Sequence, residues 1–197
     1  MKSNEFRKDL VKGYDLTQEG NTLYIKGASF LPKEIDYTDI DNVKILATEA
    51  VNTADGFYDL IKKNCNTSDP DISPKAHLEM YLALSGLACE IYMKSIIYNE
   101  NLHNGKKFIG HKLDFLFEAI PDVHKDAIRN KIKDIDIVLP TVGNAFETIR
   151  YDFELNHIQG DYFVLFDLME ELKKICDSYP KIETGSIRFA NGILDLE

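Results

Sequence analysis

The chain has 197 residues, of which 44% are apolar and 28% are charged, with 11 glycines and 6 prolines. These proportions are typical of one folded domain with a sizeable core, and they exclude collagen-like, low-complexity and disordered chains. The 23 Lys and Arg residues against 33 Asp and Glu residues give a net charge of −10, which disfavours diffuse attraction to nucleic acid or to an anionic membrane. Any phosphate must therefore be bound at a local site.

The cysteines and the N-terminal sequence indicate a cytoplasmic protein. Cys65, Cys89 and Cys176 are odd in number and form no CxxC pair, a pattern that disfavours both a disulfide framework and a zinc site. Residues 1–10 lack the apolar core of a signal peptide, and no stretch approaches the about 18 apolar residues of a membrane span. We therefore expect no membrane association.

The two ends of the chain differ from its middle. Residues 1–40 show no helical periodicity, and a short strand is expected at residues 21–25, between Gly20 and Gly27. We interpret this segment as an arm or a small hairpin, and residues 181–197 as a C-terminal tail.

Residues 41–180 carry the periodicity of amphipathic helices and predict an all-α fold, an up-and-down bundle of five or six helices. Asp41 is the expected N-cap of the first helix, and Ser73 with Pro74 is expected to start the second. The first helix should bury Val43, Leu46, Ala47, Ala50, Ala54, Phe57 and Ile61. The remaining helices are expected to begin near His111, Asp122, Pro140 and Asp161.

The second helix is apolar on nearly every side over residues 81–98, so other helices should surround it. Its charges within this run, Glu90 and Lys94, are spaced i, i+4 and can pair. Cys89 lies beside them in apolar company, where a thiol is expected to behave as a small hydrophobic side chain rather than as a nucleophile.

Familiar metal and nucleotide motifs are missing from the sequence. The five histidines form no HExxH motif and no i, i+4 pair, and the acidic residues near positions 36–41 and 134–136 lack the pattern of a calcium loop. No GxxxxGK[ST] or GxGxxG motif is present. We expect neither a metal nor a cofactor.

Arg150, Glu154 and His157 share one face of the helix expected between Pro140 and Gly160. An arginine supplies planar donors for a phosphate, and a histidine exchanges a proton near neutral pH. Together they suit metal-free RNA cleavage, in which an imidazole assists attack by the ribose 2′-hydroxyl. A purely structural interpretation stays open, because Glu154 can neutralise Arg150 and His157 can favour the helix C-terminus.

Three segments, residues 84–97 (LSGLACEIYMKSII), 110–121 (GHKLDFLFEAIP) and 146–157 (FETIRYDFELNH), resemble the HEPN superfamily of nucleotide-binding helical domains. The resemblance covers about two thirds of the chain. It rests on Glu90 and Lys94 in a central helix, then the Gly110–His111–x–Leu113 helix start, then Arg150 in a late helix.

The resemblance implies a helical core, homodimerisation, and an Arg-x(4–6)-His motif for metal-independent endoribonuclease activity in active members, as in toxin or defence systems. Arg150 and His157 would be catalytic, with Glu154, His111, Glu90 and Lys94 supporting them. We expect His111 to bond the backbone or a buried partner such as Glu90 or Tyr92. The alternative is a non-catalytic dimeric module that binds a protein or nucleotide, because the string RYDFE is similar to a pattern in HEPN-like proteins without established activity.

Overall fold

The computed structural model describes residues 15–19, 22–26, 35–64, 74–143, 161, 163–180, 188–189 and 192–193. The chain divides into two compact units. One comprises Asp36–Glu183 and holds the helices, and the other combines Met1–Ile35 with Thr184–Glu197.

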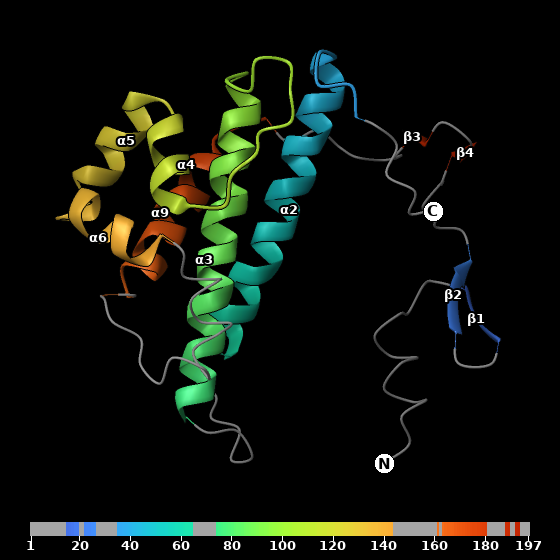
Figure 1. Ribbon diagram of the computed structural model, residues 1–197, viewed down its shortest axis with the longest axis horizontal. Helices are drawn as coiled ribbons and strands as arrows, with labels where there is room; N and C mark the ends of the chain where they lie inside the picture. The colour runs from blue at the N-terminus through green and yellow to red at the C-terminus, as the bar shows by residue number, and fades with distance from the viewer. Residues whose placement is uncertain are drawn as a thin grey trace. The chain divides into compact units, whose positions relative to one another are not determined.

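The larger unit is an up-and-down helical bundle, as the sequence predicts (Figure 1). Helix α3 is central: it packs against α2 and α9 along its length and against α4, while α4 contacts α6 and α5 contacts α9. Among the described residues the helices are α2 (Ile40–Asn64), α3 (Pro74–Asn99), α4 (Leu113–Ala119), α5 (Asp122–Arg129), α6 (Ile135–Val142) and α9 (Val164–Asp177).

Helix α3 is surrounded by its neighbours, which confirms the prediction from its apolar composition. Tyr92, Met93 and Ile96 are completely buried. By length and composition, residues His77–Asn99 could also cross a membrane, but 67% of their most apolar stretch is buried inside the bundle. That burial is characteristic of the core helix of a helical bundle.

Small residues let α2 approach α3 closely. Ala47 and Ala54 of α2 are fully buried, and the Ser95 hydroxyl of α3 donates a hydrogen bond of 2.9 Å to the Ala47 carbonyl. This bond joins the backbone of one helix to a side chain of the other, so it fixes their register as well as their separation.

Helix α2 is capped by Asp39, and the predicted cap Asp41 is wrong. The Asp39 carboxylate accepts hydrogen bonds from the backbone N–H groups of Asp41 (2.9 Å) and Asn42 (3.4 Å). These are two of the donors that a helix leaves unpaired at its start. Helix α2 therefore begins two residues earlier than the predicted cap implies, at Ile40.

The prediction that Pro140 opens a helix is also wrong, because Pro140 lies inside α6. Asp134, in the left-handed conformation with φ of 61°, precedes this helix, and its carbonyl accepts the N–H groups of Ile137 and Val138. Burial of Ile135, Leu139 and Val142 compensates for the N–H that the proline lacks. The rest of the predicted helix, through Gly160, lies outside the described residues.

The last helix, α9, packs against α3, and its buried residues are Val164, Leu165, Leu168, Met169, Leu172 and Cys176. The predicted cap Asp161 is wrong, because Phe163 occupies the N-cap position. Asp161 therefore lies two residues upstream of that position and is exposed.

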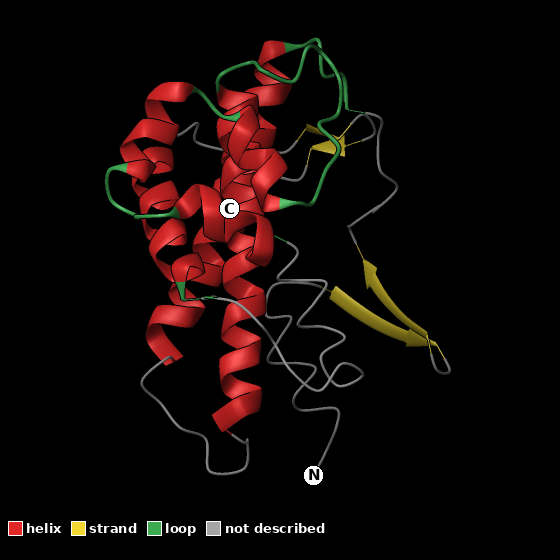
Figure 2. Cartoon of the chain, turned by 60° about the vertical axis from the view of Figure 1, so that its left-hand side comes forward, coloured by secondary structure: helices red, strands yellow, loops and turns green. Residues whose placement is uncertain are grey.

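The smaller unit contains two antiparallel hairpins (Figure 2, yellow). Strand β1 (Asp15–Glu19) pairs with β2 (Thr22–Lys26), with Leu16 opposite Ile25, which confirms the hairpin predicted for the N-terminal arm. Strand β3 (Arg188–Phe189) pairs with β4 (Gly192–Ile193) in the segment predicted to be a tail.

Two glycines of the bundle give a matched test of close packing. A Cβ on Gly143 would lie 2.8 Å from the Leu139 carbonyl oxygen and 3.2 Å from Oδ1 of Asp114, whereas a Cβ on Gly56 would meet nothing within 4 Å. We expect Gly143→Ala to lower the free energy of unfolding by about 1–3 kcal/mol. Gly56→Ala, in the middle of α2, should raise it by about 1 kcal/mol. Urea unfolding measures both, and equal effects would contradict the packing around Gly143.

Candidate functional site

A compact polar cluster joins α3 to the segment before α4. We call Glu90, Lys94 and His111 the Glu90 cluster. Oε1 of Glu90 accepts hydrogen bonds from Lys94 Nζ at 2.6 Å and from His111 Nδ1 at 2.9 Å. The Glu90 side chain is only 10% exposed, so these two bonds replace the water that burial removed.

The Glu90 cluster confirms the predicted i, i+4 pair of Glu90 with Lys94, and it shows that Glu90 is the one of the expected partners that His111 bonds. The His111 side chain is also 71% exposed, which the sequence did not predict. A carboxylate only accepts hydrogen bonds, so Nδ1 carries the hydrogen in the neutral ring. Nε2 is then the basic nitrogen of an imidazole whose ring is held in place.

Two aromatic rings lie next to this cluster. Phe108 and Phe115 are stacked, with their ring centroids 5.8 Å apart. A Cβ on Gly110 would lie 3.1 Å from the Phe115 ring, and the φ of Gly110 is +153°. Only glycine accommodates both that backbone conformation and that contact. The glycine of the GHxL segment therefore lets Phe115 lie against the backbone beside His111.

The described stretch of residues 74–143 ends next to the segment before α4, at Gly143. The carbonyl of Gly143 accepts a hydrogen bond of 3.0 Å from the backbone N–H of Leu113, two residues after His111. The predicted catalytic residues Arg150 and His157, and Glu154 between them, follow Gly143 in the sequence and lie outside the described residues.

Polar side chains elsewhere in the bundle connect helices. Asp55 of α2 accepts a hydrogen bond of 2.6 Å from the Tyr92 hydroxyl of α3 and one of 2.8 Å from Lys173 of α9. Burial and the neighbouring Asp55 carboxylate both raise the pKa of Tyr92. This cluster tethers the three longest described helices to one another, and the sequence analysis missed it because its members are far apart in the chain.

A second network joins α4, α5 and α6. Arg129 binds the Asp136 carboxylate through two nitrogens, at 2.9 and 2.8 Å, and lies over the ring of Phe117. The hydrogen bond from Arg129 lowers the pKa of Asp136. Within the described part of the chain, no group of three or more His, Cys, Asp or Glu residues could hold a metal ion.

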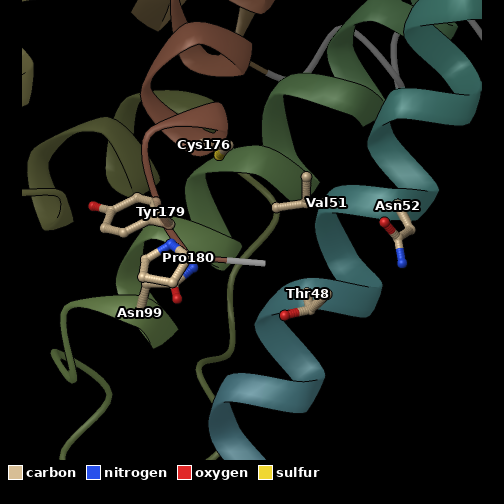
Figure 3. A pocket seen from close by; sticks show the side chains of 7 residues that line it. All are labelled: Thr48, Val51, Asn52, Asn99, Cys176, Tyr179 and Pro180. Atoms are coloured by element: carbon tan, nitrogen blue, oxygen red, sulfur yellow. The ribbon is translucent and has the colours of Figure 1, made fainter. Parts of the chain in front are cut away.

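One pocket lies between α2 and the C-terminal ends of α3 and α9 (Figure 3). Its lining comprises Thr48, Val51, Asn52, Asn99, Cys176, Tyr179 and Pro180. The space for the centre of a water molecule is about 10 Å³, which is enough for a single water and far too small for a substrate.

Comparison with known proteins assigns no family. No family model and no solved structure matches this chain. An alignment of 167 positions, which covers 80% of the chain, is 26% identical to the DVA-1 polyprotein of Dictyocaulus viviparus. The chain spans about a tenth of the length of that protein.

The Glu90 cluster leads to a first test. Glu90→Gln should lower the free energy of unfolding by about 1–3 kcal/mol, because it leaves Lys94 partly buried without its carboxylate. Lys94→Met in the Glu90→Gln background should recover part of this loss, since no uncompensated charge then remains. Urea unfolding of the two single variants and the double variant measures the coupling. Additive effects would show that the two side chains do not interact.

The buried thiols lead to a second test. Cys89 is completely buried, and burial raises its pKa, while burial raises the pKa of Cys176 to about 12. The thiolate is the reactive form, so both thiols should resist a thiol-specific reagent at neutral pH. In a Cys65→Ser chain we expect no fast-reacting thiol in the folded protein and two after unfolding in guanidinium. A fast-reacting thiol in the folded chain would contradict the placement of α9 on α3.

Proposed function

We propose that this chain is a HEPN-like helical protein that cleaves RNA without a metal ion, as a homodimer, using Arg150 and His157. The observation that supports the proposal is the Glu90 cluster. It connects two of the three segments that carry the resemblance, because Glu90 and Lys94 lie in α3 and His111 belongs to the GHxL segment before α4.

The proposed reaction is a transfer within the RNA backbone. His157 accepts the proton of a ribose 2′-hydroxyl, whose oxygen then bonds to the adjacent phosphorus. The bond from phosphorus to the 5′-oxygen breaks, and that oxygen takes up a proton, leaving a 2′,3′-cyclic phosphate and a 5′-hydroxyl. Arg150 stabilises the negative charge that accumulates on the phosphate oxygens. In a dimer, a two-fold axis would place two copies of each residue at one cleft.

The Glu90 cluster would support this chemistry from the neighbouring surface. A buried carboxylate that holds an imidazole and an ammonium group keeps both groups at fixed positions. The chain toward Arg150 leaves the described bundle at Gly143, which is hydrogen-bonded to Leu113 in the GHxL segment. Arg150 therefore lies seven positions along the chain from Gly143, the residue that is hydrogen-bonded to the GHxL segment.

The test is cleavage of single-stranded RNA in EDTA by the wild-type chain and by Arg150→Ala and His157→Ala variants. Each substitution should reduce the cleavage rate by about 100-fold or more, because a general base and a charge-stabilising group each contribute on that scale. Lys63→Ala, which removes an exposed cation from the last turn of α2, is the matched control and should retain the wild-type rate. Circular dichroism and solution mass check that every variant is folded and dimeric.

The alternative is a dimer without catalytic activity that binds a protein or a nucleotide. It predicts no cleavage by the wild-type chain, or cleavage that survives both substitutions and so comes from a contaminant. The net charge of −10 supports this alternative, since it opposes non-specific binding of nucleic acid. Cleavage that disappears in both variants and persists in the Lys63 control would exclude it.

A further inference from the structure

We infer that the surface formed by residues 106–115 binds an unpaired stretch of nucleic acid, with one base stacked on Phe115 and the phosphates facing the surrounding cations. This deepens the proposed function, since it names a binding surface for the substrate of that function. We call it the 106–115 surface. Its contacting side chains are Lys106, Lys107, Phe108, His111, Lys112 and Phe115.

The aromatic component is an exposed ring in a fixed position. Phe115 is 54% exposed although it is a large apolar side chain, and Phe108 supports it by stacking at 5.8 Å. The missing Cβ of Gly110 gives the ring room to lie there. Because more than half of the Phe115 side chain is exposed despite these two contacts, the ring offers a surface on which any base can stack.

The charge of this surface is opposite to that of the whole chain. Residues 106–115 contain three lysines and one histidine against one acidic residue, Asp114, whereas the chain as a whole has a net charge of −10. Lys106, Lys107 and Lys112 are exposed, and none forms an ion pair with a carboxylate of the described residues. Cations that are not already neutralised are what a phosphate backbone requires.

The Glu90 cluster adds a directional polar group, His111, four residues before Phe115 in the sequence. Because Nδ1 of His111 is hydrogen-bonded to Glu90, the exposed Nε2 is the nitrogen that can meet a ligand. Depending on protonation, it accepts a hydrogen bond from a 2′-hydroxyl or a base, or donates one to a phosphate. Lysines, an imidazole and an aromatic face are thus combined within ten residues of sequence.

The loop that carries this surface is already ordered, which lowers the entropic cost of binding. The backbone N–H of Phe108 donates a hydrogen bond of 3.2 Å to the Tyr98 hydroxyl. His103 is buried and its Nε2 bonds the carbonyl of Tyr37 at 3.0 Å. Asn101 and Asn104 adopt left-handed conformations, as does Gly105, and Lys106 N–H bonds the His103 carbonyl.

The experiment measures binding separately from cleavage. The full chain is titrated into fluorescent oligonucleotides about 12 nucleotides long, within the range that single-strand sites cover. One probe is 2′-O-methyl oligouridine, which lacks the hydroxyl needed for cleavage, and the other is oligothymidine. We expect Phe115→Leu to weaken anisotropy-detected binding of the better probe by about 5- to 150-fold, the effect of losing one stacked base. Phe115→Trp should retain binding.

Val123→Ala on α5 is the matched control, because Val123 is an exposed apolar residue (69%) away from this surface, and it should bind as the wild type does. The inference is overturned if the wild-type chain binds neither probe, or if Phe115→Leu and Val123→Ala bind equally well. It is also overturned if Phe115→Leu lowers the solution mass, because the ring then belongs to a contact between two copies. Binding without cleavage would refute the proposed function and leave this inference standing. Cleavage at the same rate by the wild-type chain and the Phe115→Leu variant would refute this inference and leave the proposed function standing.

Discussion

The burial of residues 81–98 of α3, none of which is exposed, constrains the rest of the bundle. Buried polar side chains in this stretch must each pair with a neighbour, because an unpaired polar group in the core costs about 1–3 kcal/mol. Ser95 meets this requirement through the Ala47 carbonyl of α2, and Tyr92 meets it through Asp55. Glu90 meets it through Lys94 and His111. The positions of α2 and of the segment before α4 are thus tied to polar groups on a single helix.

The sequence was sufficient for the long elements of the fold. The apolar run over residues 81–98 and the Pro74 start predicted α3, whose observed end at Asn99 lies one residue beyond that run. The short elements were harder, because burial of a few side chains outweighs local propensity there. Pro140 is a strong signal for a helix start, but Leu139 and Val142 are buried around it and keep it inside α6. The cap of α2 depended on which of two nearby carboxylates, Asp39 or Asp41, reaches the free N–H groups.

The candidate site was predictable in the part that is local in sequence. The spacing of Glu90 and Lys94 predicted their ion pair. The expected burial of Glu90 made this carboxylate one of the partners predicted for His111. The exposed ring of Phe115 was not predictable, because its position depends on Gly110 and on stacking with Phe108. The Asp55–Tyr92–Lys173 cluster depends on the packing of three helices and has no signature in the sequence. Arg150, Glu154 and His157 stay a prediction.

The stretch without carboxylates at residues 101–113 has a consequence for encounters in solution. The rest of the chain is predominantly negative. An approaching polyanion is therefore repelled in most orientations of the protein and attracted only when this stretch faces it. Such selection by repulsion makes collisions rarer but leaves a larger share of them correctly oriented. Dissolved salt would weaken both effects at separations beyond about 10 Å, the screening length at 0.1 M. Selectivity of approach is therefore a property of the whole charge distribution rather than of the lysines alone.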